Sequence, residues 1–209
     1  MEKEQAKKYF RKLMDRIFYN MGNTFEDYYS NGYKSINKSI GIYSVVTPQN
    51  FKINLLDKIQ GPNADLSDCL DDPSGRCKKN SDHKYLYIGK SVNLRRRIRQ
   101  YVKHDIKNHR GGYPIWFLEN NQDLYIKHIT IDEFKEQSLD ILYNPATEIY
   151  DIVKKNKKTD IAEAIESGLN ELHRLAYNNL PFANSDNDKT KVEYKQFWQK
   201  YWLDIDITE

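Results

Sequence analysis

Two short apolar runs that contain tyrosine place the strongest constraint on the fold of this chain. The first is IGIYSVV, residues 40–46, and the second is KYLYIGK, residues 84–90. Both are rich in β-branched and aromatic residues, which favours buried strands. The second run leads directly into SVNLRRRIRQY, in which apolar residues recur with helical spacing. We therefore expect a strand that continues into a strongly basic helix at the centre of the fold.

Helices are predicted around these strands. Apolar residues at helical spacing predict helices over residues 4–20, 91–107, 144–156 and 159–179, and a short aromatic helix over 192–205. Residues 113–119 (YPIWFLE) and 123–131 (DLYIKHITI) are predicted to form further strands, and residues 51–59 either a strand or a short helix. A few strands backed by helices indicate an α+β fold.

Composition excludes some classes of protein. The net charge is only +3, so a nucleic-acid partner has to be argued from where the charges lie rather than from their sum. No apolar run approaches the ~20 residues of a membrane span, and the charged first residues lack the apolar stretch of a secretory signal. We expect a cytoplasmic protein that does not bind membranes. Cys69 and Cys77 are too far apart for a compact zinc pair and are expected to be reduced loop residues.

The tripeptides GIY at 41–43 and YIG at 87–89, followed by GKSVNL and an arginine-bearing helix, resemble the GIY-YIG nuclease family. The resemblance spans residues 40–184. It implies a small three-stranded, mostly antiparallel sheet flanked by helices, and hydrolysis of DNA phosphodiester bonds. One departure is the connection between the two tyrosine strands, which is nearly forty residues long, whereas the family usually has a short hairpin there. Some restriction enzymes of the family carry such long inserts.

The length of the chain predicts one domain over residues 1–209, of which the resemblance does not cover residues 1–35 and 186–209. Residues 1–35 would form an N-terminal helical extension, residues 36–185 the nuclease core with an insert at 47–83, and residues 186–209 a C-terminal helix. Gly89 would let the chain turn into the basic helix, and Ser91 would cap that helix.

Matching residues suggest the catalytic groups. Tyr43 would act as the general base or position the attacking water, and Tyr87 would bind the phosphate or orient the nucleophile. A phenol with a pKa of about 10 is a weak base at pH 7, so nearby cations would have to lower that pKa, and the candidates are Lys90, Arg97 and a bound metal. Arg97 would stabilise the transition state. Further candidates are Lys90, Tyr101, His104, Asn184 and Glu171.

The metal ligand is expected on the helix over 159–179, which offers Glu163, Glu166 and Glu171. The apolar spacing around Glu166 fits the family pattern, whereas Glu171 lies nearer to Pro181 and Asn184, which resemble the closing Pro-x-x-Asn of the family. We predict Glu166 as the ligand of Mg²⁺ or another divalent cation such as Mn²⁺ and keep Glu171 as the alternative.

The expected partner is double-stranded DNA, bound by the outer face of the basic helix through Arg95, Arg96, Arg99 and Lys103. The short chain favours a sequence-specific restriction enzyme. The alternatives are a homing-type or repair nuclease of the same family and a DNA-binding protein that no longer cleaves. Cutting both strands favours a homodimer, formed either free or only on DNA. The aromatic C-terminal helix offers apolar surface for that dimer, unless it packs within the chain.

Overall fold

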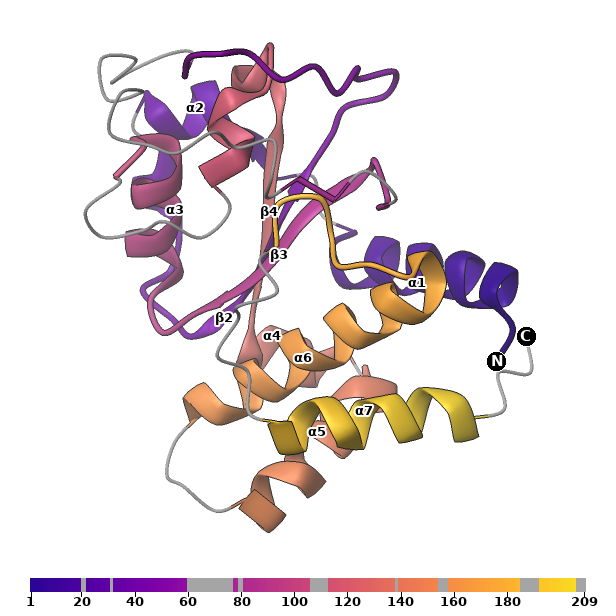
Figure 1. Ribbon diagram of the computed structural model, residues 1–209. Helices are drawn as coiled ribbons and strands as arrows, with labels where there is room; N and C mark the ends of the chain where they lie inside the picture. Colours follow the sequence, from indigo (N-terminus) through magenta and orange to yellow (C-terminus); the bar gives the residue numbers. More distant parts are fainter. Residues whose placement is uncertain are drawn as a thin grey trace.

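The computed structural model describes residues 1–19, 22–30, 32–59, 77–78, 81–105, 113–137, 139–153, 158–184 and 192–205. A four-stranded antiparallel sheet lies between two layers of helices (Figure 1). Its strands are β1 (Asn23–Thr24), β2 (Gly41–Val46), β3 (Tyr85–Ser91) and β4 (Tyr125–Thr130), in the order β1-β4-β2-β3. The α+β architecture is confirmed. The sheet has four strands rather than three because the two-residue β1, too short to show in the sequence pattern, pairs with β4.

The helices divide between the two faces of the sheet. Helices α2 and α3 cover one face, and α1 and α6 cover the other, with α5 and α7 packed on α6 (Figure 1). Their bounds are α1 (Lys3–Ile17), α2 (Phe25–Tyr29), α3 (Leu94–Val102), α4 (Ile131–Glu136), α5 (Asp140–Val153), α6 (Lys158–Tyr177) and α7 (Val192–Asp204), with 3-10 helices η1 (Gly32–Ser35), η4 (Tyr113–Phe117) and η5 (Asn121–Asp123).

Each face of the sheet has its own hydrophobic core. Ile42 and Val46 of β2 join the core under α1 and α6, whereas Tyr43 and Val45 join the core under α3. This alternation is the ordinary period of a strand. The pairing of β2 with β3 is irregular between Val45 and Val46. A bulge of this kind adds one residue to a strand and turns its side chains.

The segment YPIWFLE is not a strand, so that prediction is wrong. Residues 113–117 form η4, and all five side chains are buried. A continuous apolar run does not distinguish a buried strand from a buried helical turn, and Pro114 cannot donate a ladder hydrogen bond. Just after η4, Leu118 forms an isolated antiparallel bridge with Leu55, which is the regular pairing found in the segment 51–59.

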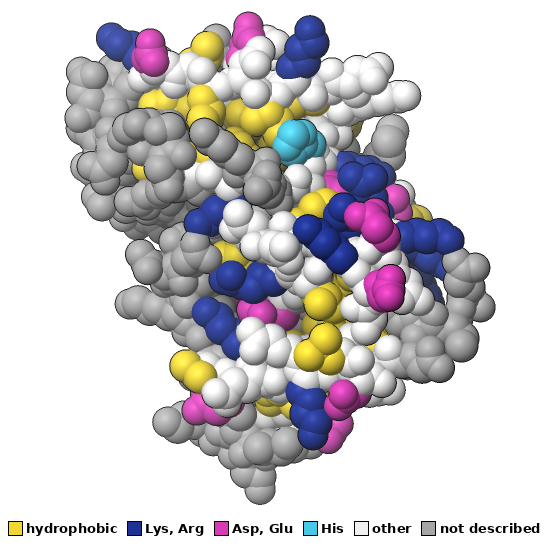
Figure 2. Space-filling view, turned by 45° about the vertical axis from the view of Figure 1, so that its right-hand side comes forward, with side chains coloured by type: hydrophobic (Ala, Val, Ile, Leu, Met, Phe, Trp, Pro, Cys, Tyr) yellow, Lys and Arg dark blue, Asp and Glu magenta, His cyan; other side chains and the backbone are white. Residues whose placement is uncertain are grey.

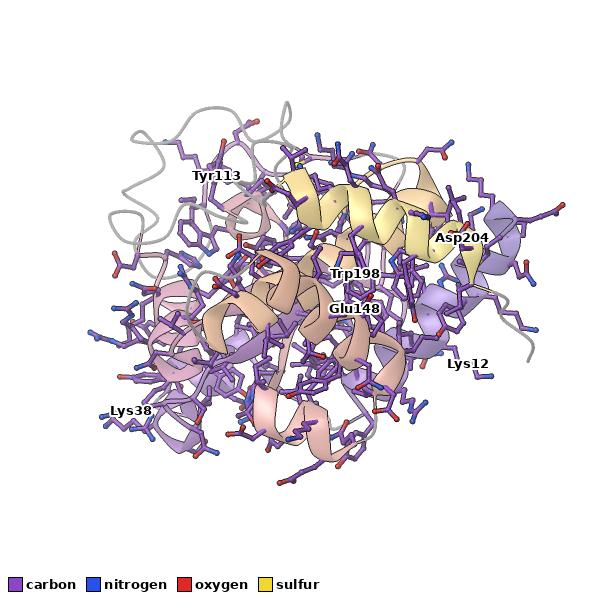
Figure 3. The ribbon with its side chains drawn as sticks, turned by 90° about the horizontal axis from the view of Figure 1, so that it is seen from below. Lys12, Lys38, Tyr113, Glu148, Trp198 and Asp204 are labelled. Atoms are coloured by element: carbon purple, nitrogen blue, oxygen red, sulfur yellow. The ribbon has the colours of Figure 1, made fainter. Side chains whose placement is uncertain are left out.

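The C-terminal helix packs within the chain. Figure 3 shows α7 lying along α6, and the Trp202 indole nitrogen donates a hydrogen bond to the carbonyl of Gly168 at 2.8 Å. A Cβ atom on Gly168 would approach the ring of Trp198 to 2.7 Å, so this contact requires glycine. Tyr194, Trp198 and Trp202 are buried. The apolar surface expected to form a dimer is therefore largely used inside the chain. None of the described helices is long and apolar enough to cross a membrane.

Candidate active site

The register of β2 with β3 brings the two predicted catalytic tyrosines together. Tyr43 lies opposite Gly89, and Tyr87 lies opposite Val45. The centroids of the Tyr43 and Tyr87 rings are 5.7 Å apart. A Cβ atom on Gly89 would lie 2.6 Å from the Tyr87 ring and 2.8 Å from the Tyr43 ring. Glycine at this position thus allows both rings to lie over the backbone of β3.

Tyr101 of α3 completes a group of three rings that we call the tyrosine cluster: Tyr43, Tyr87 and Tyr101. Its ring centroid lies 5.9 Å from that of Tyr43 and 5.6 Å from that of Tyr87. The exposed fractions of Tyr43, Tyr87 and Tyr101 are 1%, 9% and 0%. The structure therefore places Tyr101 beside both predicted catalytic tyrosines.

Burial controls the acidity of this cluster. Burial raises the pKa of Tyr43 above its ordinary value, although the Arg97 guanidinium and a hydrogen bond from the Tyr87 hydroxyl act to lower it. Burial also raises the pKa of Tyr87 and of Tyr101. The expectation that neighbouring cations make Tyr43 acidic is therefore not met by the protein alone. At neutral pH Tyr43 is a neutral phenol.

The basic helix α3 directs Arg97 toward the cluster. The positive charge of Arg97 acts on both Tyr43 and Tyr101, and the Arg97 side chain is half-buried. The helix begins at Leu94 because the Asn93 side chain accepts a hydrogen bond from the backbone nitrogen of Arg96 at 3.0 Å. The predicted cap, Ser91, is wrong. Its hydroxyl bonds instead to the backbone of Asn93, one residue outside the helix.

Side chains satisfy the outer edge of β3. The Asn184 amide donates to the carbonyl of Ile88 at 2.8 Å and accepts from its nitrogen at 3.0 Å. Two residues after Ile88 on β3, the backbone nitrogen of Lys90 donates to Glu166 Oε1 at 3.1 Å. Edge strands leave alternate backbone groups without a strand partner, and here these two side chains supply the partners. The strand edge thus holds Glu166 beside Gly89 and the tyrosines.

Lys90 bridges two carboxylates of α6. Its Nζ lies 3.2 Å from Glu163 Oε2 and 3.2 Å from Glu166 Oε2. Burial lowers the pKa of Lys90, but the two carboxylates outweigh burial and raise it. The negative charge of Glu166 also acts on Tyr43 and Tyr87. We did not select Glu163 from the sequence, although its spacing of three residues from Glu166 places both on one helix face.

Glu171 lies in different surroundings from Glu166. Its Oε2 accepts a hydrogen bond from Gln199 of α7 at 3.0 Å, and its Oε1 lies 3.4 Å from Nε of Arg174. Both Glu166 and Glu171 are buried, with 5% exposed. The structure therefore brings Glu166, and not Glu171, to Lys90 and the charges around the tyrosines.

The remaining candidates separate into different environments. His104 is buried and stacks on Trp116, with ring centroids 5.0 Å apart. Nε of Arg95 donates to the carbonyl of Ile36 at 2.7 Å, and the Lys103 ammonium lies 5.1 Å from the ring centroid of Tyr29. Of the predicted DNA contacts on α3, the exposed ones are Arg96 and Arg99.

The side chains at the edge of β3 fit a hard divalent cation that keeps most of its water. No group of three or more His, Cys, Asp or Glu side chains suited to a metal occurs in the part of the chain that the structure describes. Glu166, with Glu163 beside it, supplies carboxylate oxygen, the donor that Mg²⁺ and Mn²⁺ prefer. Such a site relies on substrate phosphate and water for its remaining ligands.

Comparisons with known proteins bear on part of this region. A search of the curated proteins and a search of the solved structures each found no match. A scan against protein families matched residues 77–139 to the GIY-YIG catalytic domain, which supports a nuclease. The matched range contains β3, α3 and β4. It includes Tyr87 and Arg97, whereas Tyr43 and Glu166 lie outside it. Residues 77–139 of this chain are therefore similar to the catalytic domain of GIY-YIG endonucleases.

Proposed function

We propose that this protein is a metal-dependent endonuclease that hydrolyses phosphodiester bonds in double-stranded DNA. The family match supports a nuclease. The observation that carries the proposal is the meeting of four elements, β2, β3, α3 and α6, near the β3 edge of the sheet. Tyr43 comes from β2, Tyr87 from β3 and Arg97 from α3, and the charge of Glu166 from α6 acts on both tyrosines.

In this proposal the tyrosines act as neutral hydroxyl groups. Because burial keeps Tyr43 protonated, its hydroxyl orients the attacking water and is not a phenolate base in the resting enzyme. Tyr87, which donates its one hydroxyl proton to Tyr43, holds that hydroxyl in place and so orients the nucleophile through it. Arg97 stabilises the negative charge that develops on the phosphate oxygens, as preorganised cations do in such sites.

Glu166 would hold the divalent cation, with Glu163 near enough to bind its water. A bound Mg²⁺ or Mn²⁺ supplies Lewis-acid stabilisation of the phosphate and of the leaving oxygen. Lys90 balances the two carboxylates in the protein described here. It remains available to neutralise one carboxylate when the phosphate is bound.

Sequence-specific restriction is the finer part of the proposal. It is supported by the long connection between β2 and β3. A homodimer on a two-fold symmetric site would cut both strands, although its interface would have to lie outside the buried aromatic residues of α7. A homing-type or repair nuclease is the alternative within the family. If the protein is not an enzyme, the alternative is a DNA-binding protein that does not cleave.

Cleavage of plasmid DNA tests the proposal. The purified protein is incubated with plasmid in Mg²⁺, in Mn²⁺ and in a chelator, and the ends of any products are sequenced. Metal-dependent cutting at defined positions is the expected result. Salt-dependent binding without cutting in either metal would favour the non-cleaving protein. Cutting at undefined positions would argue against restriction but leave the nuclease in place.

A further inference from the structure

Asn170 of α6 is a buried amide whose oxygen lacks a partner in the part of the chain that the structure describes. Its exposed fraction is 6%. Oδ1 is buried, and no hydrogen-bond donor among the described residues reaches it. Asn184, which is equally buried, shows the usual arrangement, because its oxygen accepts from the nitrogen of Ile88 and its nitrogen donates to the carbonyl of the same residue.

A buried amide oxygen without a partner destabilises the folded chain, because it loses the hydrogen bonds of water without replacement. In native folds such groups are explained by catalysis, by a bound water or by a bound ion. On the face drawn in Figure 2, the described Asp and Glu side chains are scattered among Lys and Arg and form no separate acidic patch. A site for a cation is therefore better sought among the buried groups of α6 than on this surface.

The Asn170 side chain lies on the same face of α6 as the two carboxylates beside Lys90. It follows Glu163 by seven residues and Glu166 by four, all within α6, and residues at these spacings lie on one side of a helix. Side chains of a helix lean toward its N-terminus, so each covers the preceding turn. The Asn170 amide is therefore directed toward the turn that carries Glu166.

The oxygen atoms on this face suit a hard divalent cation, since Mg²⁺ and Mn²⁺ prefer carboxylate, carbonyl and water oxygens. Neighbouring ligand oxygens around an octahedral Mg²⁺ are about 3 Å apart. Side chains one helical turn apart, with Cβ atoms about 5–6 Å apart, can bring their oxygens to that separation. The Lys90 ammonium lies 3.2 Å from both Glu163 and Glu166. This face of α6 thus already attracts positive charge.

We infer that the Asn170 amide oxygen is a second protein ligand of the divalent cation that Glu166 holds. The inference deepens the proposed function and rests on the metal-dependent nuclease described above. It assigns to the protein one ligand position that would otherwise be left to water. The sequence did not single out Asn170, because one Asn within a helix has no spacing that distinguishes a ligand from an ordinary polar residue.

Four variants test this ligand against a purely structural amide. Asn170→Leu removes both polar ends of the side chain at nearly the same size, Asn170→Asp keeps an oxygen, and Glu166→Gln removes the proposed first ligand. Asn121→Leu is the matched control, because Asn121 is a buried amide, 3% exposed, whose nitrogen donates to the carbonyl of Trp116 at 2.8 Å. Binding of Mn²⁺ to each protein without DNA is measured by electron paramagnetic resonance, and unfolding by urea is measured in a chelator.

Asn170→Leu is expected to bind Mn²⁺ about tenfold more weakly than the wild type, as when a partner group of a metal site is removed. Its urea midpoint in the chelator should equal or exceed that of the wild type, because the substitution breaks no hydrogen bond of Oδ1. Asn121→Leu should keep the wild-type affinity but unfold at a lower urea concentration. Asn170→Asp should bind Mn²⁺ at least as tightly as the wild type, since a charged ligand oxygen replaces a neutral one.

Wild-type Mn²⁺ affinity in Asn170→Leu would overturn the inference, and so would an equal loss of affinity in Asn170→Asp. If Glu166→Gln alone binds Mn²⁺ more weakly, the metal site proposed above stands and only the role of Asn170 is wrong. If the wild type binds Mn²⁺ no better than Glu166→Gln does, both the metal site and its second ligand are wrong. Mn²⁺ binding that depends on Asn170, without plasmid cleavage by the wild type, would contradict the nuclease and support the ligand.

Discussion

Tyr85 and Tyr87 lie two residues apart on β3, yet they belong to opposite faces of the sheet. A regular strand would place both on one face, and the irregular pairing between Val45 and Val46 is what separates them. The Tyr85 hydroxyl donates to the carboxylate of Asp15. The Tyr87 hydroxyl donates to Tyr43, close to the charges of Arg97 and Glu166.

This difference shows how one residue type serves two purposes on a single strand. On the α1 face two tyrosine hydroxyls bond to carboxylates: Tyr85 to Asp15 and Tyr177 to Asp82. Such bonds tie helices to the sheet. On the α3 face the hydroxyls lie beside one another and beside charges of both signs. The first arrangement suits stability, and the second suits proposed chemistry on a phosphate.

The largest expected effect on the cleavage rate comes from removing the negative charge of Glu166, which acts on Tyr87. Glu166→Gln removes the proposed metal ligand but keeps an oxygen that accepts from the Lys90 nitrogen. We expect the cleavage rate to fall by about three orders of magnitude or more, because a metal contributes several kcal/mol to the transition state. Plasmid cleavage and duplex binding are measured, and binding should be nearly unchanged.

Glu171→Gln is the matched control for that change, since Glu171 is equally buried and bonded to a side chain of α7. It is expected to cleave at close to the wild-type rate. The opposite outcome, an active Glu166→Gln and an inactive Glu171→Gln, would show that the ligand assignment is wrong.

The next largest effect on the cleavage rate is expected from removing the Tyr43 hydroxyl on the α3 face. Tyr43→Phe removes the hydroxyl that we expect to orient the water, and the rate should fall by about 10²-fold, as expected when a reactant is no longer positioned. The ring packing with Tyr87 and Tyr101 is kept, but the buried Tyr87 hydroxyl loses its acceptor, so the unfolding free energy should fall by about 1–2 kcal/mol. A rate within a few-fold of the wild type would remove Tyr43 from the chemistry.

Acid is expected to weaken the α1 face first. Burial lowers the pKa of His173 to about 4, while its Nε2 accepts from the backbone nitrogen of Asp82 and its Nδ1 bonds to the carbonyl of Asn179. The unfolded chain therefore binds the proton more tightly. Stability is full above the unfolded pKa of about 6.5 and falls as pH drops toward 4, by about 3 kcal/mol in total.

Urea unfolding of the wild type and of His173→Gln at several pH values between 7.5 and 4 measures this loss. The variant should be less stable at pH 7.5 but should lose less stability on acidification. Burial also lowers the pKa of His128, so part of the loss remains in the variant. An identical pH dependence in both proteins would contradict the role given to His173.

The smallest expected effect comes from removing the Tyr85 hydroxyl, which tests whether the two faces of the sheet act independently. Tyr85→Phe removes the hydrogen bond to Asp15 and is expected to cost about 1–2 kcal/mol of unfolding free energy. Cleavage should stay unchanged, because the ring lies in the core opposite to the tyrosine cluster. Equilibrium unfolding and plasmid cleavage are measured on the same preparation. A rate loss comparable to that of Tyr43→Phe would mean that the two faces are not independent.

Much of the fold follows from local pattern. The helical spacing of 4–20, 159–179 and 192–205 and the β-branched runs at 40–46 and 84–90 correspond to α1, α6, α7, β2 and β3. These segments repeat one period long enough to be recognised. The short elements failed. YPIWFLE has no period that separates a strand from η4, and β1 has only two residues.

The sequence by itself identified Tyr43, Tyr87, Arg97 and Glu166 as a set, through a resemblance to known nucleases. It did not show how they meet, because β2, α3 and α6 are far apart along the chain. Tertiary structure decided that Glu166 bonds to the edge of β3 while Glu171 bonds to α7. It also decided that Tyr43 is neutral, since burial, which is a property of the packed core, outweighs the nearby cation.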